Sequence, residues 1–308
     1  MMNITVLGSG AMGSLFGGLL TADGHDLTLV DVWKEHIETM KERGLVISTP
    51  EGTERNIEVE ATADPSSIGN ADLVIVFVKS YQTKEALQDT SGFFDENVDV
   101  LTLQNGLGNP ETISEYVPEK NIIAGVTAHG STLKNPGHII HAGVGPTKIG
   151  RYFTENDEKV SQLSKILTSA GFETEVTERI REEIWEKLLV NVGINPPTAL
   201  ARVRNGLLVE TEAGEELIET IVNEALQVAV EEGVNVREDI VNHVKNVASS
   251  TSANKSSMLQ DIEAGKKTEI EYLTGSIVRR AEKHDIEVPI NRTLKHLVEL
   301  SERTQNGT

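Results

Sequence analysis

Three polar side chains recur at a four-residue spacing inside an otherwise apolar stretch of the chain, residues 184–197. They are Lys187, Asn191 and Asn195, and a helix would place them on one stripe about 12 Å long. Apolar residues surround the stripe, which predicts a buried helix. Buried ammonium and amide groups are costly unless each finds a partner. A lysine that reaches solvent and two amides that cap loops are the alternative, but three polar groups in register favour a site for a polar ligand.

A glycine-rich turn follows the first predicted strand, residues 3–7, and precedes a stretch with apolar residues at helical spacing. The turn consists of Gly8, Ser9, Gly10, Ala11, Met12 and Gly13. This order of elements is the dinucleotide-binding fingerprint, in which the helix amides bind the pyrophosphate. Gly8 would allow the tight turn, Gly10 the approach of the pyrophosphate, and Gly13 the packing of helix on strand. An ordinary strand-to-helix turn is the alternative, and the full context disfavours it.

The end of the second predicted strand, residues 27–30, bears on the choice of cofactor. Asp31 follows it at once, and a carboxylate at this place accepts hydrogen bonds from the ribose 2′-hydroxyl and repels a 2′-phosphate. No arginine comes next, and the first cation is Lys34. We therefore expect NADH to be preferred, with NADPH as a second, poorer cofactor.

Two further apolar runs, residues 73–78 and 98–103, predict parallel strands buried on both faces. Polar turns that begin at Lys79 and Gln104 follow them, at the sheet edge where ligands bind in open α/β sheets. Asn105 would thus meet the cofactor or substrate, or serve only as a turn residue. Beyond residue 122 we expect one strand, a hairpin formed by residues 138–141 and 147–150, a helix over 158–170, and a last strand over 172–176.

Strand signals vanish after residue 178, and helical periodicity replaces them. The predicted fold is therefore α/β in residues 1–177, a Rossmann domain with a doubly wound sheet, joined to an all-helical C-terminal domain in residues 178–308. Pro196 and Pro197 are expected to end the first long helix, which would place Asn195 at its end. Amphipathic helices are predicted over residues 212–232, 239–248 and 292–303. Their inward residues would include Leu217, Leu297 and Leu300.

Composition narrows the classes of partner. The 308-residue chain has 48 acidic and 28 basic residues and a formal charge of -20, which repels nucleic acid and anionic membranes. We therefore expect no nucleic-acid partner and no membrane partner. Cysteine is absent, which excludes disulfides, thiolate metal sites and thiol nucleophiles. His138 and His141 lack a nearby acidic ligand, so we expect no metal. Without a long apolar run or a basic leader, a cytoplasmic location is expected.

Taken in order, these motifs resemble the ketopantoate reductase family (2-dehydropantoate 2-reductase) over nearly the whole chain. The resemblance rests on the glycine turn, Val78-Lys79, Gln104-Asn105-Gly106, the segment from Lys187 to Pro196, Thr198-Ala199-Leu200, the run from Ser256 to Asp261, and Thr268-Glu269-Ile270. It implies a helical domain of the 6-phosphogluconate dehydrogenase type and an active site between the two domains. It also implies hydride transfer from the nicotinamide to the C2 ketone of 2-dehydropantoate, giving (R)-pantoate for coenzyme A synthesis.

The resemblance also implies roles for particular residues. Lys187 would donate the proton to the carbonyl oxygen, as suits an ammonium near a developing alkoxide. The residues expected to hold the substrate are Asn191, Asn195, Asn205, Asn254, Lys255, Ser256 and Ser257. Besides the glycine turn and Asp31, the residues expected to contact the cofactor are Lys79, Asn105, Ser131 and Glu269.

One departure and two alternatives remain open. NADPH-using members of the family carry a basic residue where this chain has Asp31, which is the reason to expect NADH. A related reductase of another branched 2-oxo acid would share most of these motifs. A redox-sensing NAD-binding regulator without turnover would not need a buried lysine and its polar stripe. The helical domain could support a homodimer, but no interface is evident in the sequence.

Overall fold

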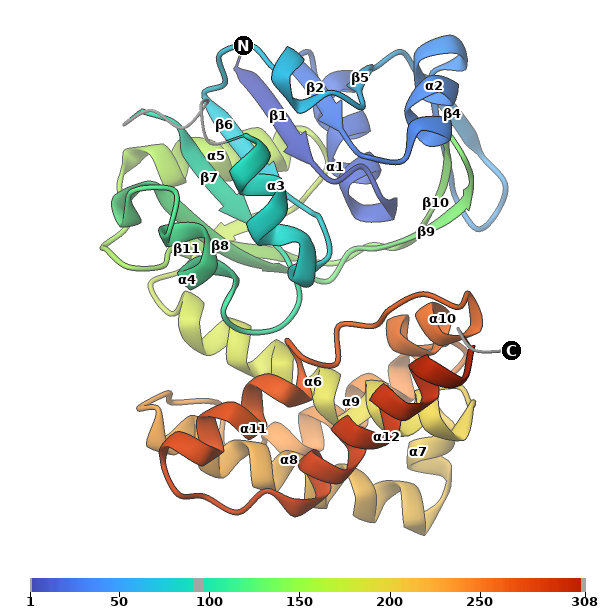
Figure 1. Ribbon diagram of the computed structural model, residues 1–308, viewed down its shortest axis with the longest axis vertical. Coiled ribbons are helices and arrows are strands. Elements are labelled where there is room, and N and C mark those ends of the chain that lie inside the picture. The colour runs from blue at the N-terminus through green and yellow to red at the C-terminus, as the bar shows by residue number, and fades with distance from the viewer. Residues whose placement is uncertain (1, 91–96, 306–308) are drawn as a thin grey trace. The chain divides into compact units, whose positions relative to one another are not determined.

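The computed structural model describes residues 2–90 and 97–305, and the chain divides into two compact units. The first unit comprises Met1–Gln104 and Asn109–Ile180, and the second comprises Asn105–Gly108 and Arg181–Thr308. Figure 1 shows strands throughout the first unit and helices throughout the second. The four residues Asn105–Gly108 therefore belong with the helical unit, although they follow a strand of the sheet.

An eight-stranded sheet forms the centre of the first unit, in the order β12-β11-β8-β7-β6-β1-β2-β5. Its strands are β1 (Asn3–Leu7), β2 (Asp26–Val30), β5 (Glu60–Thr62), β6 (Leu73–Val76), β7 (Asp99–Thr102), β8 (Ile122–Thr127), β11 (Thr147–Arg151) and β12 (Thr174–Val176). All neighbours pair in parallel except β8 and β11. The prediction of a doubly wound α/β sheet is confirmed.

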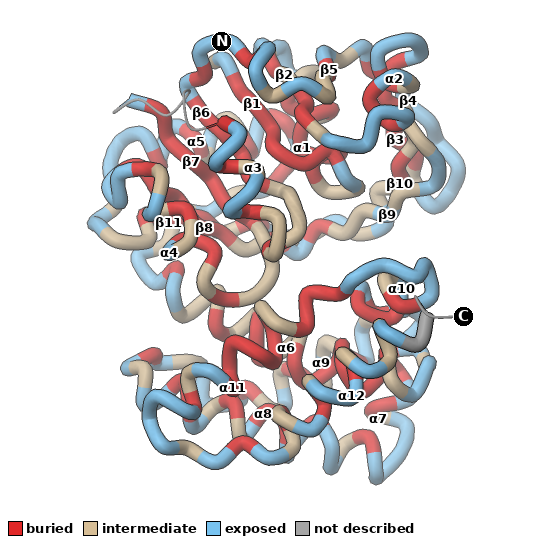
Figure 2. Tube along the Cα trace, in the orientation of Figure 1, coloured by how far each residue is buried: buried red, intermediate tan, exposed pale blue. Residues whose placement is uncertain are grey.

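Helices cover both faces of this sheet. Helices α1 (Ala11–Ala22) and α5 (Glu158–Ser169) pack on one face, where they share a core with Leu73 and Ile75 of β6. Helices α3 (Thr83–Asp89) and α4 (Asn109–Ser114) pack on the other, against Val74 and Val76. Because neighbouring residues of β6 serve opposite faces, the strand is apolar at every position. Figure 2 shows the resulting band of buried residues along the central strands.

A smaller sheet with the order β4-β3-β10-β9 completes the first unit. Its strands are β3 (Leu45–Ser48), β4 (Glu54–Ile57), β9 (Gly130–Asn135) and β10 (His138–Gly143), and helix α2 (Lys34–Arg43) precedes β3. The predicted hairpin of residues 138–141 with 147–150 is wrong. Strand β10 pairs with β9 and β3, whereas β11 pairs with β8 and β12 in the large sheet. Gly137, with a φ of +70°, makes the tight turn between β9 and β10.

The described part of the second unit contains helices and no strand. They are α6 (Ile180–Ala201), α7 (Leu207–Glu210), α8 (Glu212–Glu231), α9 (Ile240–Ser250), α10 (Ser257–Glu263), α11 (Thr274–Lys283) and α12 (Pro289–Gln305). Thr211 caps α8 by accepting from Gly214 N, as its position before that helix predicts. Leu217, Leu297 and Leu300 are exposed rather than inward. Within the described chain, no helix is long and apolar enough to cross a membrane.

Helix α6 continues through Pro196 and Pro197 to Ala201, so the predicted helix end at residue 195 is wrong. Each proline removes one backbone donor, but Val192, Ile194 and Ala199 on either side are buried in the core of the unit. That packing outweighs two lost hydrogen bonds. The helix ends where Arg202 adopts a left-handed backbone with a φ of 55°. Asn195 therefore lies inside the helix.

Two histidines in the first unit predict a loss of stability in acid. His129 Nδ1 lies 2.9 Å from His141 Nε2, and burial lowers the pKa of both below the usual 6.5. The unfolded chain therefore takes up these protons first, so stability is full above pH 6.5 and falls as the pH drops toward the folded-state pKa values. Denaturant unfolding should give a lower free energy of unfolding at about pH 5.5 than at about pH 7.5. His141→Gln should narrow that difference, and an unchanged difference would contradict this account.

Candidate functional site

The glycine turn at the carboxyl end of β1 has the shape that a pyrophosphate requires. Gly8 has a φ of +94°, and a side chain there would collide with Val78 N. A side chain on Gly13 would collide with Gly8 O, whereas one on Gly10 would meet nothing within 4 Å. Helix α1 starts directly afterwards, and no side chain caps its first amides. Open space and uncapped amides at a helix N-terminus suit an anionic group.

Asp31, at the end of β2, is held against this turn. Its Oδ2 accepts from Ser9 N at 2.7 Å and its Oδ1 accepts from Trp33 N at 3.0 Å. A carboxylate has about four acceptor positions, so each oxygen keeps one for a ribose hydroxyl. Ser9 Oγ is buried and has no hydrogen-bond partner in the described chain. Ala11 and Met12 form the first turn of α1. The residues present therefore fit a dinucleotide.

Two other residues expected at the cofactor lie in the same unit. Lys79 precedes the short 3-10 helix η2 (Ser80–Gln82), beyond the carboxyl end of β6, and it has an interaction with a neighbour. Ser131 lies in β9 opposite His141. Its Oγ is buried and has no partner among the described residues. Ser131 Oγ is thus, with Ser9 Oγ, a second buried hydroxyl of this unit to which a ligand could hydrogen-bond.

In the second unit, the polar stripe of α6 lies in a largely buried helix. Asn195 is 7% exposed, and Lys187 and Asn191 are half-buried. Among the described residues, no group forms a salt bridge with Lys187 or a hydrogen bond with the side-chain amides of Asn191 and Asn195. Burial lowers the pKa of Lys187 to about 8, against the field of Glu269, which raises it. The stripe therefore offers an ammonium and two amides to a ligand.

Glu269 reaches the vicinity of Lys187 from the loop before α11. It is 9% exposed, and its neighbour Thr268 is tied to the last helix: both Thr268 N and Thr268 Oγ1 donate to Glu302 Oε1, at 2.7 and 2.6 Å. Glu302 thereby fixes the loop that carries Glu269. Sequence reasoning missed it, because an acidic residue near the end of an amphipathic helix gives no local signal.

Asn105 lies in the second unit, beside the same loop. Leu107 N donates to Tyr272 O at 3.0 Å, and Tyr272 N in turn donates to Glu269 O at 3.0 Å. Gly106 has a φ of +86°, and a side chain there would collide with Tyr272 O. The structure thus brings the Asn105 segment and the Glu269 loop together, although 164 residues separate them in the sequence.

The remaining predicted substrate residues lie around the start of α10. Asn205 N donates to Asn254 O at 3.0 Å, and Asn205 Oδ1 is buried without a partner in the described chain. Ser256 caps α10, and its Oγ lies 2.8 Å from Thr198 Oγ1 of α6. Ser257 is the first residue of α10.

The side chain of Lys255 is not part of the group around Asn205. Its ammonium lies 2.7 Å from both oxygens of Glu263, and both residues are exposed. As placed, Lys255 is paired at the surface, and only the backbone of its segment joins the group around Asn205.

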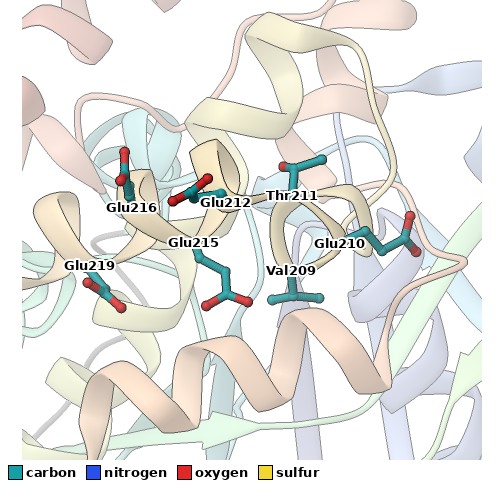
Figure 3. A pocket seen from close by; sticks show the side chains of 7 residues that line it. All are labelled: Val209, Glu210, Thr211, Glu212, Glu215, Glu216 and Glu219. Carbon is teal, nitrogen blue, oxygen red and sulfur yellow. The ribbon is translucent and has the colours of Figure 1, made fainter.

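A separate hollow of about 440 Å³ lies at the start of α8 (Figure 3). It is lined by Val209, Glu210, Thr211, Glu212, Glu215, Glu216 and Glu219. Lys245 forms salt bridges with Glu215 and Glu219 at 2.7 and 2.6 Å. This acidic surface repels an anionic substrate, so it does not compete with the α6 stripe for that role. Among the described residues, no three or more His, Asp or Glu side chains are arranged so that they could hold a metal ion.

Known proteins are similar to this chain over nearly its whole length. The family model described as "Ketopantoate reductase PanE/ApbA" matches residues 4–153, and its C-terminal counterpart matches residues 179–302. A 2-dehydropantoate 2-reductase of Halobacterium salinarum is 45% identical over 98% of this chain and 99% of its own. One from Pyrococcus horikoshii is 37% identical over 100% of both chains.

Solved structures agree with these matches. A PanE/ApbA family ketopantoate reductase from Ralstonia eutropha has a TM-score of 0.91 at 32% identity and covers 99% of this chain and 100% of its own. A D-mandelate dehydrogenase in ternary complex with NADH and anilino(oxo)acetate has a TM-score of 0.94 at 29% identity, with the same coverage.

The site geometry predicts an unusually acidic lysine. After reductive methylation with ¹³C-formaldehyde, the lysine resonance that disappears in Lys187→Arg should titrate at about 8. Because the Glu269 carboxylate stabilises the ammonium, Glu269→Gln should move this titration to lower pH. Glu271→Gln is a control, because Glu271 forms a salt bridge with Lys295 and is not among the groups that shift the Lys187 pKa. A Lys187 titration near 10.5, the usual lysine value, would contradict the described environment.

Proposed function

The chain belongs to the ketopantoate reductase family, and we propose that it reduces the C2 ketone of 2-dehydropantoate to give (R)-pantoate with a nicotinamide cofactor. The unpartnered stripe of Lys187, Asn191 and Asn195 in α6 is the observation that carries the proposal. Full-length relatives named 2-dehydropantoate 2-reductase support the choice of substrate. The proposed pathway role is pantothenate and coenzyme A synthesis, and the proposed compartment is the cytoplasm.

In the proposed mechanism, Lys187 is the proton donor. The cofactor supplies the hydride when it is bound. As negative charge develops on the carbonyl oxygen, the Lys187 ammonium stabilises it and delivers a proton. A pKa of about 8 keeps Lys187 protonated at neutral pH and makes it a better acid than a solvent-exposed lysine. Glu269 preserves the protonated form, because its field raises the pKa of Lys187.

Amide and hydroxyl groups would hold the substrate. Asn191 and Asn195 offer N–H donors to the carboxylate and acceptors to the hydroxyl group of 2-dehydropantoate. Asn205 would contribute its buried, unpartnered Oδ1 as a further acceptor. Ser257 and the backbone amides at the start of α10 would assist at the carboxylate. Local donors of this kind allow an anionic substrate to bind a chain whose formal charge is -20.

A second candidate is reduction of another 2-oxo acid. The observation that favours it is the likeness to the D-mandelate dehydrogenase that binds NADH and anilino(oxo)acetate, at 29% identity. The α6 stripe offers an ammonium for a ketone oxygen and amides for a neighbouring carboxylate. Every 2-oxo acid has these two groups, whichever side chain it carries. A non-catalytic NAD-binding regulator is less well supported, since it would have no use for an acidic lysine.

We propose NADH as the preferred cofactor. Asp31 presents a charged carboxylate beside the glycine turn, where a 2′-phosphate would have to lie. Both Asp31 oxygens accept backbone hydrogen bonds, which fixes the carboxylate in place. The NADH complexes of the similar D-mandelate dehydrogenase are consistent with this preference.

Oxidation of NADH in the presence of a panel of 2-oxo acids tests the proposed reaction. We expect the highest kcat/KM with 2-dehydropantoate, and a loss of about a hundredfold or more in kcat for Lys187→Ala with little change in NADH affinity. Lys245→Ala is a matched control, because Lys245 is a paired lysine of the same unit at the acidic hollow. A higher kcat/KM with an aromatic 2-oxo acid would favour the second candidate. An unchanged kcat in Lys187→Ala would exclude Lys187 as the acid.

Kinetics with the two cofactors test the role of Asp31. We expect kcat/KM to be higher with NADH than with NADPH by about tenfold. The Asp31 carboxylate would repel the 2′-phosphate of NADPH, and NADH has no such phosphate. Asp31→Asn keeps acceptor capacity without charge, so it should improve NADPH use more than NADH use. A tenfold preference of the wild type for NADPH would overturn this proposal.

A further inference from the structure

A buried histidine that the proposed mechanism does not use is linked to the glycine turn. His36, in α2, and Ser14, in α1, are both 0% exposed. His36 Nε2 lies 3.2 Å from Ser14 Oγ, and Ser14 Oγ donates to Ser9 O at 2.6 Å. On its other side, His36 Nδ1 accepts from Gly137 N at 2.9 Å, in the turn between β9 and β10. The imidazole thus connects the small sheet to the glycine turn.

Only one arrangement of protons satisfies all three contacts. Gly137 N can only donate, so Nδ1 of His36 carries no proton, and in a neutral ring the proton lies on Nε2. Nε2–H therefore donates to Ser14 Oγ. Ser9 O can only accept, so the single hydroxyl proton of Ser14 points to it. The relay runs in one direction, from Gly137 through His36 and Ser14 to Ser9.

This relay orients a peptide group of the glycine turn. In a trans peptide the N–H points opposite to the C=O, so the bond to Ser9 O fixes the direction of Gly10 N–H, which shares that peptide. Asp31 fixes the preceding peptide in the same way, through Ser9 N at 2.7 Å. Both peptides that flank Ser9 are therefore held from outside the turn. No side chain caps the amides that follow at the start of α1.

We propose that His36 and Ser14 are positioning residues for cofactor binding, which they promote by holding the Ser9–Gly10 peptide in the orientation that presents its amide to the pyrophosphate. The inference rests on the proposed nicotinamide-dependent function. It adds a role for two residues that touch neither the substrate nor the reacting atoms. Trp33 stacks on the His36 ring with centroids 4.9 Å apart and keeps the imidazole in its plane.

The relay requires a neutral imidazole. A proton on Nδ1 would face Gly137 N–H, so two donors would meet and the contact would break. Burial lowers the pKa of His36, which favours the neutral ring, whereas the charge of Asp31 at the end of β2 and an interaction with the Ser9 backbone raise it. The other groups that face the ring, the Ser9 backbone, Ser14, Trp33 and Gly137, are uncharged.

Calorimetric titration with NADH tests the inference without relying on turnover. Ser14→Ala removes the hydroxyl that holds Ser9 O, and we expect the Kd for NADH to rise by about three- to tenfold, while kcat at saturating cofactor is unchanged. Ser48→Ala is the matched control. Ser48 is another buried serine that bonds a histidine, His138, and a backbone carbonyl, that of Ile139, but it lies in the small sheet and has no bond to the glycine turn. Its Kd should equal that of the wild type.

Two substitutions of His36 separate positioning from packing. In His36→Gln the side-chain N–H can still donate to Ser14 Oγ, so the Kd should stay near the wild-type value. In His36→Asn only the contact with Gly137 N can be kept, so the Kd should rise as in Ser14→Ala. Between about pH 7.5 and about pH 5.5, the wild-type Kd should rise more than that of His36→Gln, which cannot titrate.

Binding by Ser14→Ala at the wild-type Kd would overturn the inference alone. So would equal Kd values for His36→Gln and His36→Asn, which remain the decisive pair if Ser14→Ala fails to fold. A wild-type chain that binds neither NADH nor NADPH would instead contradict the proposed function, and the inference would fall with it.

Discussion

The second unit is organised by the cost of keeping polar groups in an apolar helix. The ammonium of Lys187 has no salt-bridge partner, and the side-chain amides of Asn191 and Asn195 have no hydrogen-bond partner, among the described residues. Leaving such groups unsatisfied is expensive. The fold nevertheless holds them in place. Val222 and Val244 pack so closely on Gly193 that a side chain there would lie within 3.0 Å of both, which fixes α6 against α8 and α9. A ligand that forms hydrogen bonds with these side chains would offset the free-energy cost of leaving them unsatisfied.

The same division operates at the glycine turn of the first unit. The backbone of Ser9 is hydrogen-bonded on both sides, because its N–H donates to Asp31 and its carbonyl accepts from Ser14. By contrast, no side chain caps the amides at the start of α1, and the space beside Gly10 is open. In each unit, some of the groups expected to contact a ligand have no partner among the described residues: the side-chain amides of Asn191 and Asn195 in α6, and Ser9 Oγ in the glycine turn. Polar groups held in place before a ligand binds are what electrostatic preorganisation of the proposed site would require.

The glycine turn and most strands of the large sheet could be predicted from sequence because their signals are local, whereas the short strand β5 was not predicted. The β-branched run before Gly8 and the apolar run from Leu73 can each be recognised as a strand from a few consecutive residues. The predicted helix end at Pro196 failed because tertiary packing outweighs the local cost of proline. Strand β10 was assigned the wrong partner because pairing with β3 spans about 90 residues. Glu302 bonds Thr268 and His36 bonds Gly137. These contacts join residues far apart in the chain, so the spacing of apolar residues could not predict them.

The most direct test of the account is whether substrate contacts the α6 stripe. In a chain labelled with ¹⁵N-asparagine, variants Asn191→Asp and Asn195→Asp assign the two side-chain amide resonances. Pantoate added in the presence of NAD⁺ should shift both resonances, and the Asn291 amide, which is buried and bonded to Glu224 and Ile221, should not move. If pantoate binds while the amides of Asn191 and Asn195 keep their positions, the α6 stripe is not the substrate site.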